Sequence, residues 1–261
     1  MNNGEIRITA VIPAHLASVR FPRKILIDIK GLPMVEHVRR RALLSFKNED
    51  VYVATCDSQI TESLSKFNAN LIQTSNKHTN GTNRVAEAVK HIDCTHVILL
   101  QGDEPLLLPS HLDLVKEEIN KNPDGDAWNV VGPLNEAKDL DKHSFVKSIT
   151  SVNNKIIYCF RKSPITADFE VSQSFVKKIH GIIAYRKDFL LNLVEMPLSN
   201  VEKNESIEQM RIIENGFILN SVLVDSSTPS INEPHELDIV LSSLANNKLQ
   251  SGILEKILSL N

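Results

Sequence analysis

Two carboxylates that follow a short apolar run are the residues best placed to do chemistry in this chain. Val97 to Leu100 are four apolar residues in a row, and Gln101-Gly102-Asp103-Glu104-Pro105 follows directly. Such a run is typical of a strand buried in a parallel sheet, and ligands gather at the carboxyl ends of such strands. Asp103 is therefore a candidate ligand for a divalent cation held against a bound phosphate. The alternative interpretation is that both acids only cap the helix that follows.

Two polar loops earlier in the chain could supply the rest of a nucleotide site. The segment after the first expected strand carries His15, Arg20 and Lys24. A second loop, 76–84, contains Gly81 and opens into a helix, where backbone N–H groups can bind an anion. Cations, a backbone nest and a carboxylate are what a nucleoside triphosphate with Mg²⁺ requires. The chain has no glycine-lysine-serine run of the P-loop type, which argues against a P-loop ATPase.

The elements that carry these loops alternate between strand and helix over the first 120 residues. Strands are expected at Ile6 to Ile12, Val51 to Thr55, Leu71-Ile72 and Val97 to Leu100. Helices are expected after Pro33, from Ser58 to Phe67, from Val85 to Val89 and from Ser110. The alternation predicts an α/β fold with a doubly wound, mostly parallel sheet.

The second half of the chain is richer in β-structure. Four strands are expected in the ranges 127–131, 145–152, 155–160 and 176–185, with an exposed loop at 164–174. A helix expected over 205–215 would place Glu205, Glu208 and Gln209 on one face, because they lie three and four residues apart. A strand at 217–224 and two amphipathic helices complete the chain. With no linker evident, the prediction is one domain over 1–261 with a β-rich elaboration at about 127–216.

Composition narrows the class of protein. The 261 residues carry a formal net charge of -3, which provides no general attraction to nucleic acid or anionic lipid. The three cysteines are widely spaced and odd in number, which favours a reducing compartment. No secretion signal or membrane span is evident, so a cytoplasmic protein is expected. The run Arg39-Arg40-Arg41 is interpreted as the solvated face of a helix.

The order of these motifs resembles one known family, the 3-deoxy-manno-octulosonate cytidylyltransferases (CMP-Kdo synthetases). The segment from Pro13 to Lys24 is similar to the family's first signature, and Gly81-Thr82-Asn83-Arg84 is similar to its glycine loop. Gln101-Gly102-Asp103-Glu104-Pro105 matches the central motif without change. Further matches follow in order over nearly the whole chain, at Arg161, Gly181, Ala184-Tyr185-Arg186, Glu205, Glu208-Gln209 and Arg211.

The resemblance implies a nucleotide-diphospho-sugar transferase fold and a CTP-dependent reaction. CMP would pass from CTP to the anomeric hydroxyl of 3-deoxy-manno-octulosonate (Kdo), or of a modified eight-carbon relative such as an amino-Kdo. Pyrophosphate would be released, and the product would serve lipopolysaccharide precursor synthesis in a homodimeric enzyme. The implied catalytic residues are Arg20, Lys24 and Asp103.

The resemblance also implies binding roles for other residues. The nucleotide would be bound by Pro13, Ala14, His15, Arg20, Lys24, Asn80, Gly81, Thr82, Arg84 and Gln101. The sugar acid would be held by Gln101, Arg161, Tyr185, Glu208 and Gln209. Mg²⁺ would be held by Asp103 and Asn232.

Several departures from the family pattern leave the substrate open. His15 stands where the family has arginine, Arg23 where it has glycine, and Asn83 where it has an acid. Ile179 stands at the family's histidine position, with His180 one place off, and Ile183 replaces a tyrosine. Asn232 takes the place of a second metal-binding aspartate, with Glu233 as an alternative ligand. Two other hypotheses are a same-fold enzyme for another sugar acid or a phosphonate, and a non-catalytic nucleotide-binding homologue.

Overall fold

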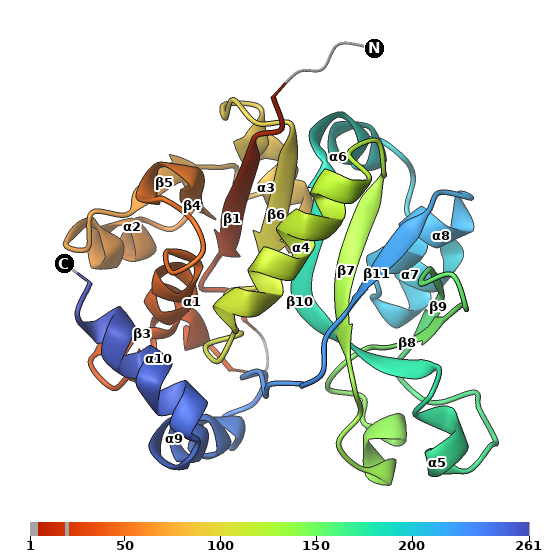
Figure 1. Ribbon diagram of the computed structural model, residues 1–261. Coiled ribbons are helices and arrows are strands. Elements are labelled where there is room, and N and C mark those ends of the chain that lie inside the picture. The colour runs from red at the N-terminus through yellow and green to blue at the C-terminus, as the bar shows by residue number, and fades with distance from the viewer. Residues whose placement is uncertain (1–4, 19–20, 261) are drawn as a thin grey trace. The chain divides into compact units, whose positions relative to one another are not determined.

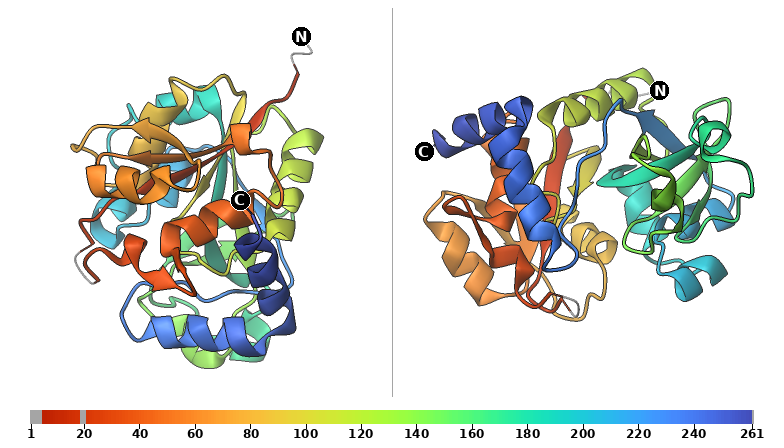
Figure 2. Two further views of the ribbon diagram at one scale, coloured as in Figure 1. Left: turned by 90° about the vertical axis from the view of Figure 1, so that its left-hand side faces the viewer. Right: turned by 90° about the horizontal axis from the view of Figure 1, so that it is seen from below.

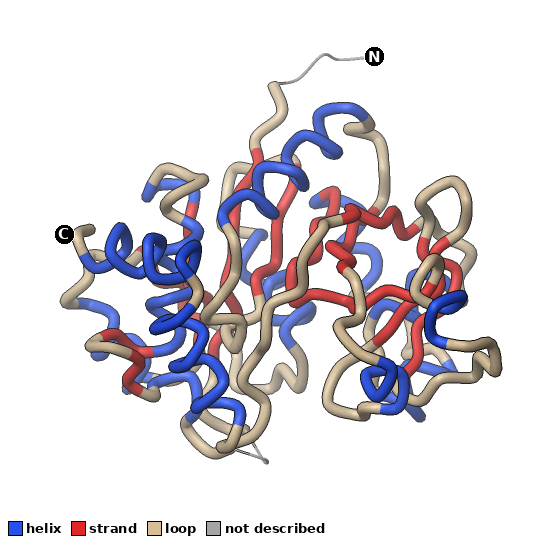
Figure 3. Tube along the Cα trace, turned by 60° about the horizontal axis from the view of Figure 1, so that its bottom comes forward, coloured by secondary structure: helices blue, strands red, loops and turns tan. Residues whose placement is uncertain are grey.

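The computed structural model describes residues 5–18 and 21–260, and the chain divides into two compact units. Unit 1 comprises residues 1–113 and 228–261, and unit 2 comprises residues 114–227. Helix α4 (Pro109–Lys121) crosses the boundary between the two stretches of sequence. Each unit combines strands with helices, as Figure 3 shows. The β-rich segment expected at about 127–216 lies inside unit 2.

Unit 1 is built on four parallel strands in the order β6-β1-β4-β5 (Figure 1). They are β1 (Ile8–Ala14), β4 (Val51–Thr55), β5 (Asn70–Gln73) and β6 (His96–Leu100). All of β6 and the last six residues of β1 are buried, as expected for strands inside a parallel sheet with covered faces. The predicted α/β fold is confirmed. Strand β1 starts and ends two residues later than expected, so Pro13 and Ala14 belong to it.

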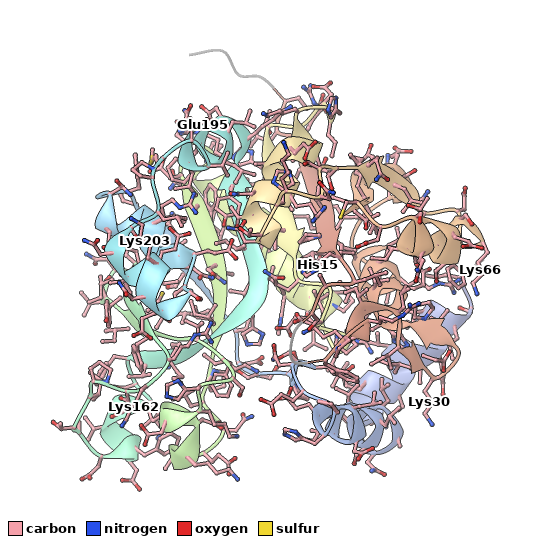
Figure 4. The ribbon with its side chains drawn as sticks, turned by 180° about the vertical axis from the view of Figure 1, so that it is seen from behind. His15, Lys30, Lys66, Lys162, Glu195 and Lys203 are labelled. Atoms are coloured by element: carbon pink, nitrogen blue, oxygen red, sulfur yellow. The ribbon has the colours of Figure 1, made fainter. Side chains whose placement is uncertain are left out.

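Helices cover the two faces of these strands. Helix α1 (Met34–Ala42) and helix α10 (Lys248–Leu258) lie on the face seen in Figure 1, and α3 (Gly81–Val89) lies on the face seen in Figure 4. Helix α9 (Glu236–Asn246) packs against α10, which in turn packs against α1 (Figure 2). Helix α3 begins at Gly81 and not at Val85, so the end of the glycine loop is already helical. The remaining elements of unit 1 are α2 (Ser58–Ser65), the hairpin of β2 (Asp28–Ile29) and β3 (Leu32–Pro33), and two short 3₁₀ turns, Lys24–Leu26 and Asn48–Asp50.

Three consecutive arginines on α1 are buried, and the prediction of a solvated face was wrong. Arg39, Arg40 and Arg41 are 2%, 6% and 0% exposed. The fully buried Glu36 accepts from Arg39 and Arg40, with nitrogen–oxygen distances of 2.7 Å. The guanidinium groups also donate to backbone carbonyls far along the chain, those of Phe67, Leu107, Ile257 and Leu260. All nine residues of α1 are buried, so even its polar side is covered by neighbouring segments.

Unit 2 has a mixed sheet in which β7 lies between β11 and β10, while β8 pairs with both β10 and β9. The strands are β7 (Ala127–Gly132), β8 (Lys147–Thr150), β9 (Ile156–Phe160), β10 (Val176–Arg186) and β11 (Leu219–Leu223). Its helices are α5 (Phe169–Ser172), α6 (Lys187–Leu193), α7 (Asn200–Glu205) and α8 (Gln209–Glu214), with a 3₁₀ turn at Ala137–Asp141.

The structure corrects the helix predictions for unit 2. The helix expected over 205–215 is shorter than predicted: Glu205 is the last residue of α7, the backbone at Ser206 has a φ of 53°, and α8 begins only at Gln209. Glu205 and Gln209 therefore do not share one helix face. The loop expected at 164–174 contains α5, whose Ser172 is fully buried, and α6 was not predicted. Among the residues that the structure describes, no helix is both long enough and apolar enough to span a bilayer.

Candidate active site

In unit 1 a lysine, a carboxylate and a backbone carbonyl meet at the carboxyl end of β6. Lys24 Nζ lies 2.7 Å from Asp103 Oδ2 and 2.9 Å from the carbonyl oxygen of Ile231. The Ile231 amide donates to the Asp103 carbonyl over 3.0 Å, which joins the C-terminal segment to the loop after β6. The Lys24 and Asp103 side chains are 14% and 24% exposed, so the ion pair is shielded from water but reachable.

The turn that follows Ile231 carries the proposed second metal ligand. The backbone N–H groups of Asn232 and Glu233 both donate to Glu236 Oε2, over 2.5 and 2.9 Å. Asn232 Nδ2 donates to Ser230 Oγ over 3.0 Å, and a Glu233 carboxylate oxygen lies 3.5 Å from the His235 ring. Asn232 is thus next in sequence to the carbonyl that Lys24 contacts. Glu236 holds this turn in place and was not singled out from the sequence.

Two glycines allow three loops of unit 1 to approach one another closely. A Cβ on Gly102 would lie 2.5 Å from Ile25 Cδ1 in the segment after β1. A Cβ on Gly81 would lie 3.1 Å from Pro13 Cγ and 3.5 Å from Gln101 Nε2. A Cβ at Gly102 would force the Ile25 side chain to move, and one at Gly81 would press on the Pro13 ring, which is a physical reason for glycine in both motifs. Three of the predicted nucleotide residues, Pro13, Gly81 and Gln101, therefore lie together.

Other predicted nucleotide residues shape the start of α3. Asn80 is the N-cap, and its side chain accepts from the Asn83 amide over 2.8 Å. Thr82 and Arg84 are 6% and 2% exposed. Arg84 donates to Thr74 Oγ over 2.6 Å, which anchors the helix to the segment after β5. These contacts stabilise the loop, and direct contact of these residues with a nucleotide stays a prediction.

Burial is the main influence on the ionisation of His15. Withdrawal of its imidazole from water lowers the pKa of His15, and the Arg84 and Lys24 charges lower it further, against the opposing carboxylates of Asp57 and Asp103. Asp57 also accepts from the Leu16 amide over 2.9 Å and so fixes the loop after β1. Figure 4 shows His15 on the side opposite to the view of Figure 1. Arg20, predicted as catalytic, lies outside the described residues.

In unit 2 the predicted Arg161 is bound to the backbone. Its guanidinium donates to the carbonyl oxygens of Glu205, Ser206 and His143 over 2.9, 3.1 and 2.9 Å. Arg161 therefore caps the C-terminal end of α7, where the unpaired carbonyl groups of the last turn attract a cation. The buried Lys147 donates to the Arg161 carbonyl, and burial together with the Arg161 charge lowers the pKa of Lys147 to about 8.

The remaining predicted sugar residues of unit 2 are spread over two elements. Gln209 begins α8, and its Nε2 donates to Asn129 Oδ1 on β7 over 3.0 Å. Glu208 directly precedes it and is half-buried, whereas Tyr185 on β10 is 2% exposed. Asn129 was not predicted as a site residue. The signal for it was a polar residue within the otherwise apolar strand expected at 127–131.

The oxygens around Lys24 also bear on metal binding. Within residues 5–18 and 21–260, no three His, Cys, Asp or Glu side chains gather as a metal cluster. Mg²⁺, however, is commonly held by one or two protein carboxylates together with substrate phosphates. Asp103 Oδ2 and the Ile231 carbonyl oxygen converge on a single cation, the Lys24 ammonium. The donor set therefore suits a hard cation that also has phosphate ligands.

The fold and this cluster agree with the comparisons with known proteins. Residues 9–225 match the family model described as cytidylyltransferase. The chain therefore belongs to the cytidylyltransferase family, whose members are CTP-dependent nucleotidyltransferases.

The relatives that resemble it include 3-deoxy-manno-octulosonate cytidylyltransferases of two bacteria. The protein of Chlorobium limicola is 36% identical over 88% of this chain and 94% of its own length. The protein of Geobacter sulfurreducens is 32% identical over 92% of this chain and 100% of its own length. The resemblance inferred from the motifs is confirmed.

Two solved structures also match the fold of this chain. A CMP:2-keto-3-deoxy-manno-octonic acid synthetase complexed with CTP matches with a TM-score of 0.84 and 31% identity, over 92% of this chain and 98% of the other. A cytidylyltransferase from Leptospira borgpetersenii matches with a TM-score of 0.65 and 14% identity, over 97% of this chain and 94% of the other, which shows a shared fold alone.

Proposed function

We propose that this protein transfers CMP from CTP to the anomeric hydroxyl of Kdo or of a modified eight-carbon 3-deoxy sugar acid, such as an amino-Kdo. The hydroxyl oxygen forms a bond to the α-phosphorus, the bond from that phosphorus to the β-phosphate oxygen breaks, and pyrophosphate leaves. The hydroxyl proton is lost to solvent. The activated sugar supplies lipopolysaccharide precursors. The observation that carries the proposal is the cluster of Lys24, Asp103 and the Ile231 carbonyl in a chain with these relatives.

In this proposal unit 1 binds the nucleotide. Lys24 exchanges its contact with Asp103 for triphosphate oxygens and neutralises charge as pyrophosphate leaves. Arg20 assists at the triphosphate. The closely packed segments that contain Pro13, Gly81 and Gln101 enclose the nucleoside. Ala14, His15, Asn80, Thr82 and Arg84 belong to the same binding surface.

Asp103 and Asn232 would hold Mg²⁺ in the proposed complex. The bound ion would supply Lewis-acid chemistry, withdrawing charge from the phosphate that is attacked. Asn232 can offer only a neutral amide oxygen where relatives are expected to have a carboxylate, so the second contact is weaker. If Asn232 is the ligand, Asn232→Asp lowers the Mg²⁺ concentration needed for half-maximal rate. If Glu233 is the ligand, Glu233→Gln raises that concentration and Asn232→Asp has no effect.

In unit 2 the proposed sugar-acid contacts are Arg161, Tyr185, Glu208 and Gln209. Partial exposure and a defined hydrogen bond to Asn129 support the proposed contact of Gln209 with the sugar acid. The cationic charge of Arg161 supports its proposed contact, because a guanidinium binds a carboxylate well. The three cysteines are free thiols, which is compatible with the proposed cytoplasmic location.

We further propose that the enzyme acts as a homodimer. Apolar side chains stand exposed on unit 2, among them Ile157 on β9 and Leu223 on β11, which are 54% and 45% exposed. Sedimentation equilibrium at micromolar concentration tests this proposal, and a single species of 29.2 kDa would contradict it.

The experiment for the reaction is pyrophosphate release from CTP with a panel of acceptors. The panel contains Kdo, an amino-Kdo, a nine-carbon sugar acid and a simple phosphonate. We expect turnover with an eight-carbon acid and at least tenfold less with the others. Turnover only with the phosphonate or the nine-carbon acid would support the same-fold alternative. CTP binding without turnover for any acceptor would support the non-catalytic alternative.

A further inference from the structure

One buried side chain fills an irregularity in the sheet of unit 2. Between Ile179 and Ile183, β10 advances four residues while its partner β7 advances only two. A bulge of this kind interrupts the regular ladder of backbone hydrogen bonds. Asn129 Nδ2 donates to the carbonyl oxygens of His180 and Ile182, over 3.0 and 2.9 Å, within the bulged stretch. Asn129 is 0% exposed, so water cannot take over these contacts.

These two hydrogen bonds determine how the Asn129 amide is oriented. A carboxamide has a donor end and an acceptor end. If the amide were turned around, its oxygen would face two carbonyl oxygens and both interactions would be repulsive. The nitrogen must therefore face β10, and Oδ1 must face away from it. That oxygen accepts the hydrogen bond from Gln209 Nε2, over 3.0 Å.

The orientation of Asn129 in turn determines the orientation of Gln209. Because one N–H of the Gln209 nitrogen is bound to Asn129, its Oε1 faces away from Asn129 and is the acceptor open to other contacts, and the residue is partly exposed. The backbone that carries Gln209 is also held. Arg211 on α8 pairs with Glu202 on α7 through two hydrogen bonds of 2.7 and 2.5 Å, and both side chains are at least 95% buried.

We infer that Gln209 presents a hydrogen-bond acceptor to the sugar acid, and that Asn129 is the positioning residue that sets this polarity. The inference rests on the proposed function, in which Gln209 contacts the acceptor substrate. The substrate group at this point is a donor, either a hydroxyl or an ammonium. A carboxylate, a ketone or an ether oxygen, which can only accept, cannot hydrogen-bond to Oε1.

The test uses sugar acids in which each hydroxyl other than the reacting anomeric one is in turn replaced by fluorine, which cannot donate, or by an amine, which donates. The kcat/KM of each analogue is measured for the wild type, Gln209→Glu and Gln209→Leu. At one position we expect fluorine to lower kcat/KM about tenfold, the worth of one hydrogen bond, while the amine is tolerated. Gln209→Glu keeps an acceptor toward the substrate but cannot donate to Asn129 Oδ1, so it should keep part of the loss. Gln209→Leu should reduce the loss below about threefold.

Asn129→Ala provides a second readout that a purely structural role would not change. Releasing the Gln209 amide should shrink the fluorine effect at the same position while leaving the KM for CTP unchanged. If this variant does not fold, the two Gln209 variants alone test the inference.

Rejection of the amine, with Gln209→Glu behaving like Gln209→Leu, would overturn the inference, because Gln209 would then be a donor. Turnover with no position sensitive to Gln209 would also overturn it while upholding the proposed function. Absence of turnover with every sugar acid would overturn both.

Discussion

Removing the Arg40 side chain should destabilise the protein strongly without changing its catalytic chemistry. Arg40 is 6% exposed, and its Nε lies 2.7 Å from Glu36. Its Nη1 donates to the Ile257 and Leu260 carbonyls over 2.7 and 2.6 Å, which fastens the end of α10 to α1. A hydrogen bond to a charged group contributes about 1.5–3 kcal/mol.

The magnitude for Arg40→Ala follows from what is lost and what is retained. Glu36 keeps its two bonds to Arg39 in the variant, so its charge is still compensated and the full cost of an orphaned buried carboxylate does not arise. Three bonds of this kind together contribute more than about 4 kcal/mol, but the variant no longer carries the desolvation cost of a buried guanidinium, so the net fall in the free energy of unfolding should be about 3 kcal/mol. For a chain of this length that corresponds to a fall in Tm of roughly 6–12 °C.

Urea unfolding followed by circular dichroism measures the effect, with Arg7→Ala as the matched control. Arg7 also pairs with a carboxylate, Asp93, but the two side chains are 47% and 86% exposed. The control should change stability by no more than about 0.5 kcal/mol. Arg40→Lys, which keeps the charge and loses the planar fork, should recover part of the loss. Equal small effects for Arg40→Ala and Arg7→Ala would refute the assignment of Arg40 as a buried anchor.

Three further predictions concern the site and the pH dependence of stability. Asp103→Asn should lower turnover about 100-fold or more with an unchanged circular dichroism spectrum, and full activity at saturating Mg²⁺ would contradict the metal assignment. Lys24→Ala should lower kcat strongly, and Lys24→Arg should restore it only in part, because an ammonium and a guanidinium differ in shape. Arg40→Ala is the control: measured well below its Tm, its kcat and its KM for CTP should stay unchanged. Burial lowers the pKa of His37 from 6.5 to about 4, so between these values the unfolded chain binds the proton and the folded chain does not. Stability should therefore fall by about 3 kcal/mol as the pH drops from 6.5 to 4, and His37→Gln should flatten this dependence; an unchanged slope in urea unfolding would refute it.

Local patterns in the sequence were sufficient for the fold class and for the core of the candidate site. The apolar run before Asp103 indicates a buried parallel strand, and the carboxyl end of that strand is where ligands are held. The strand–helix alternation predicts the parallel sheet, and the structure confirms it. Lys24 and Asp103 were assigned to one site from sequence motifs, and the structure brings their side chains within 2.7 Å.

Tertiary packing decided which polar residues are buried and what they contact. The pattern of α1 shows an apolar stripe, but it contains no information on whether a later segment will cover the other side. Helix α10, more than 200 residues further on, supplies the carbonyl that Arg40 binds, and the carbonyl of Ile231 reaches Lys24 in the same way. Such contacts depend on chain segments that no local window includes.

The break between α7 and α8 and the role of Asn129 are of the same kind. Glu205 and Gln209 have helical spacing, yet Ser206 takes a left-handed conformation while Arg161 binds the carbonyl groups around it. Asn129 is a single polar residue in an apolar strand, and only the bulge in β10 explains why an amide is needed there. Sequence periodicity records which face of an element is apolar. The partners of a buried polar group are determined by the fold as a whole, because each donor and acceptor must find its match in three dimensions.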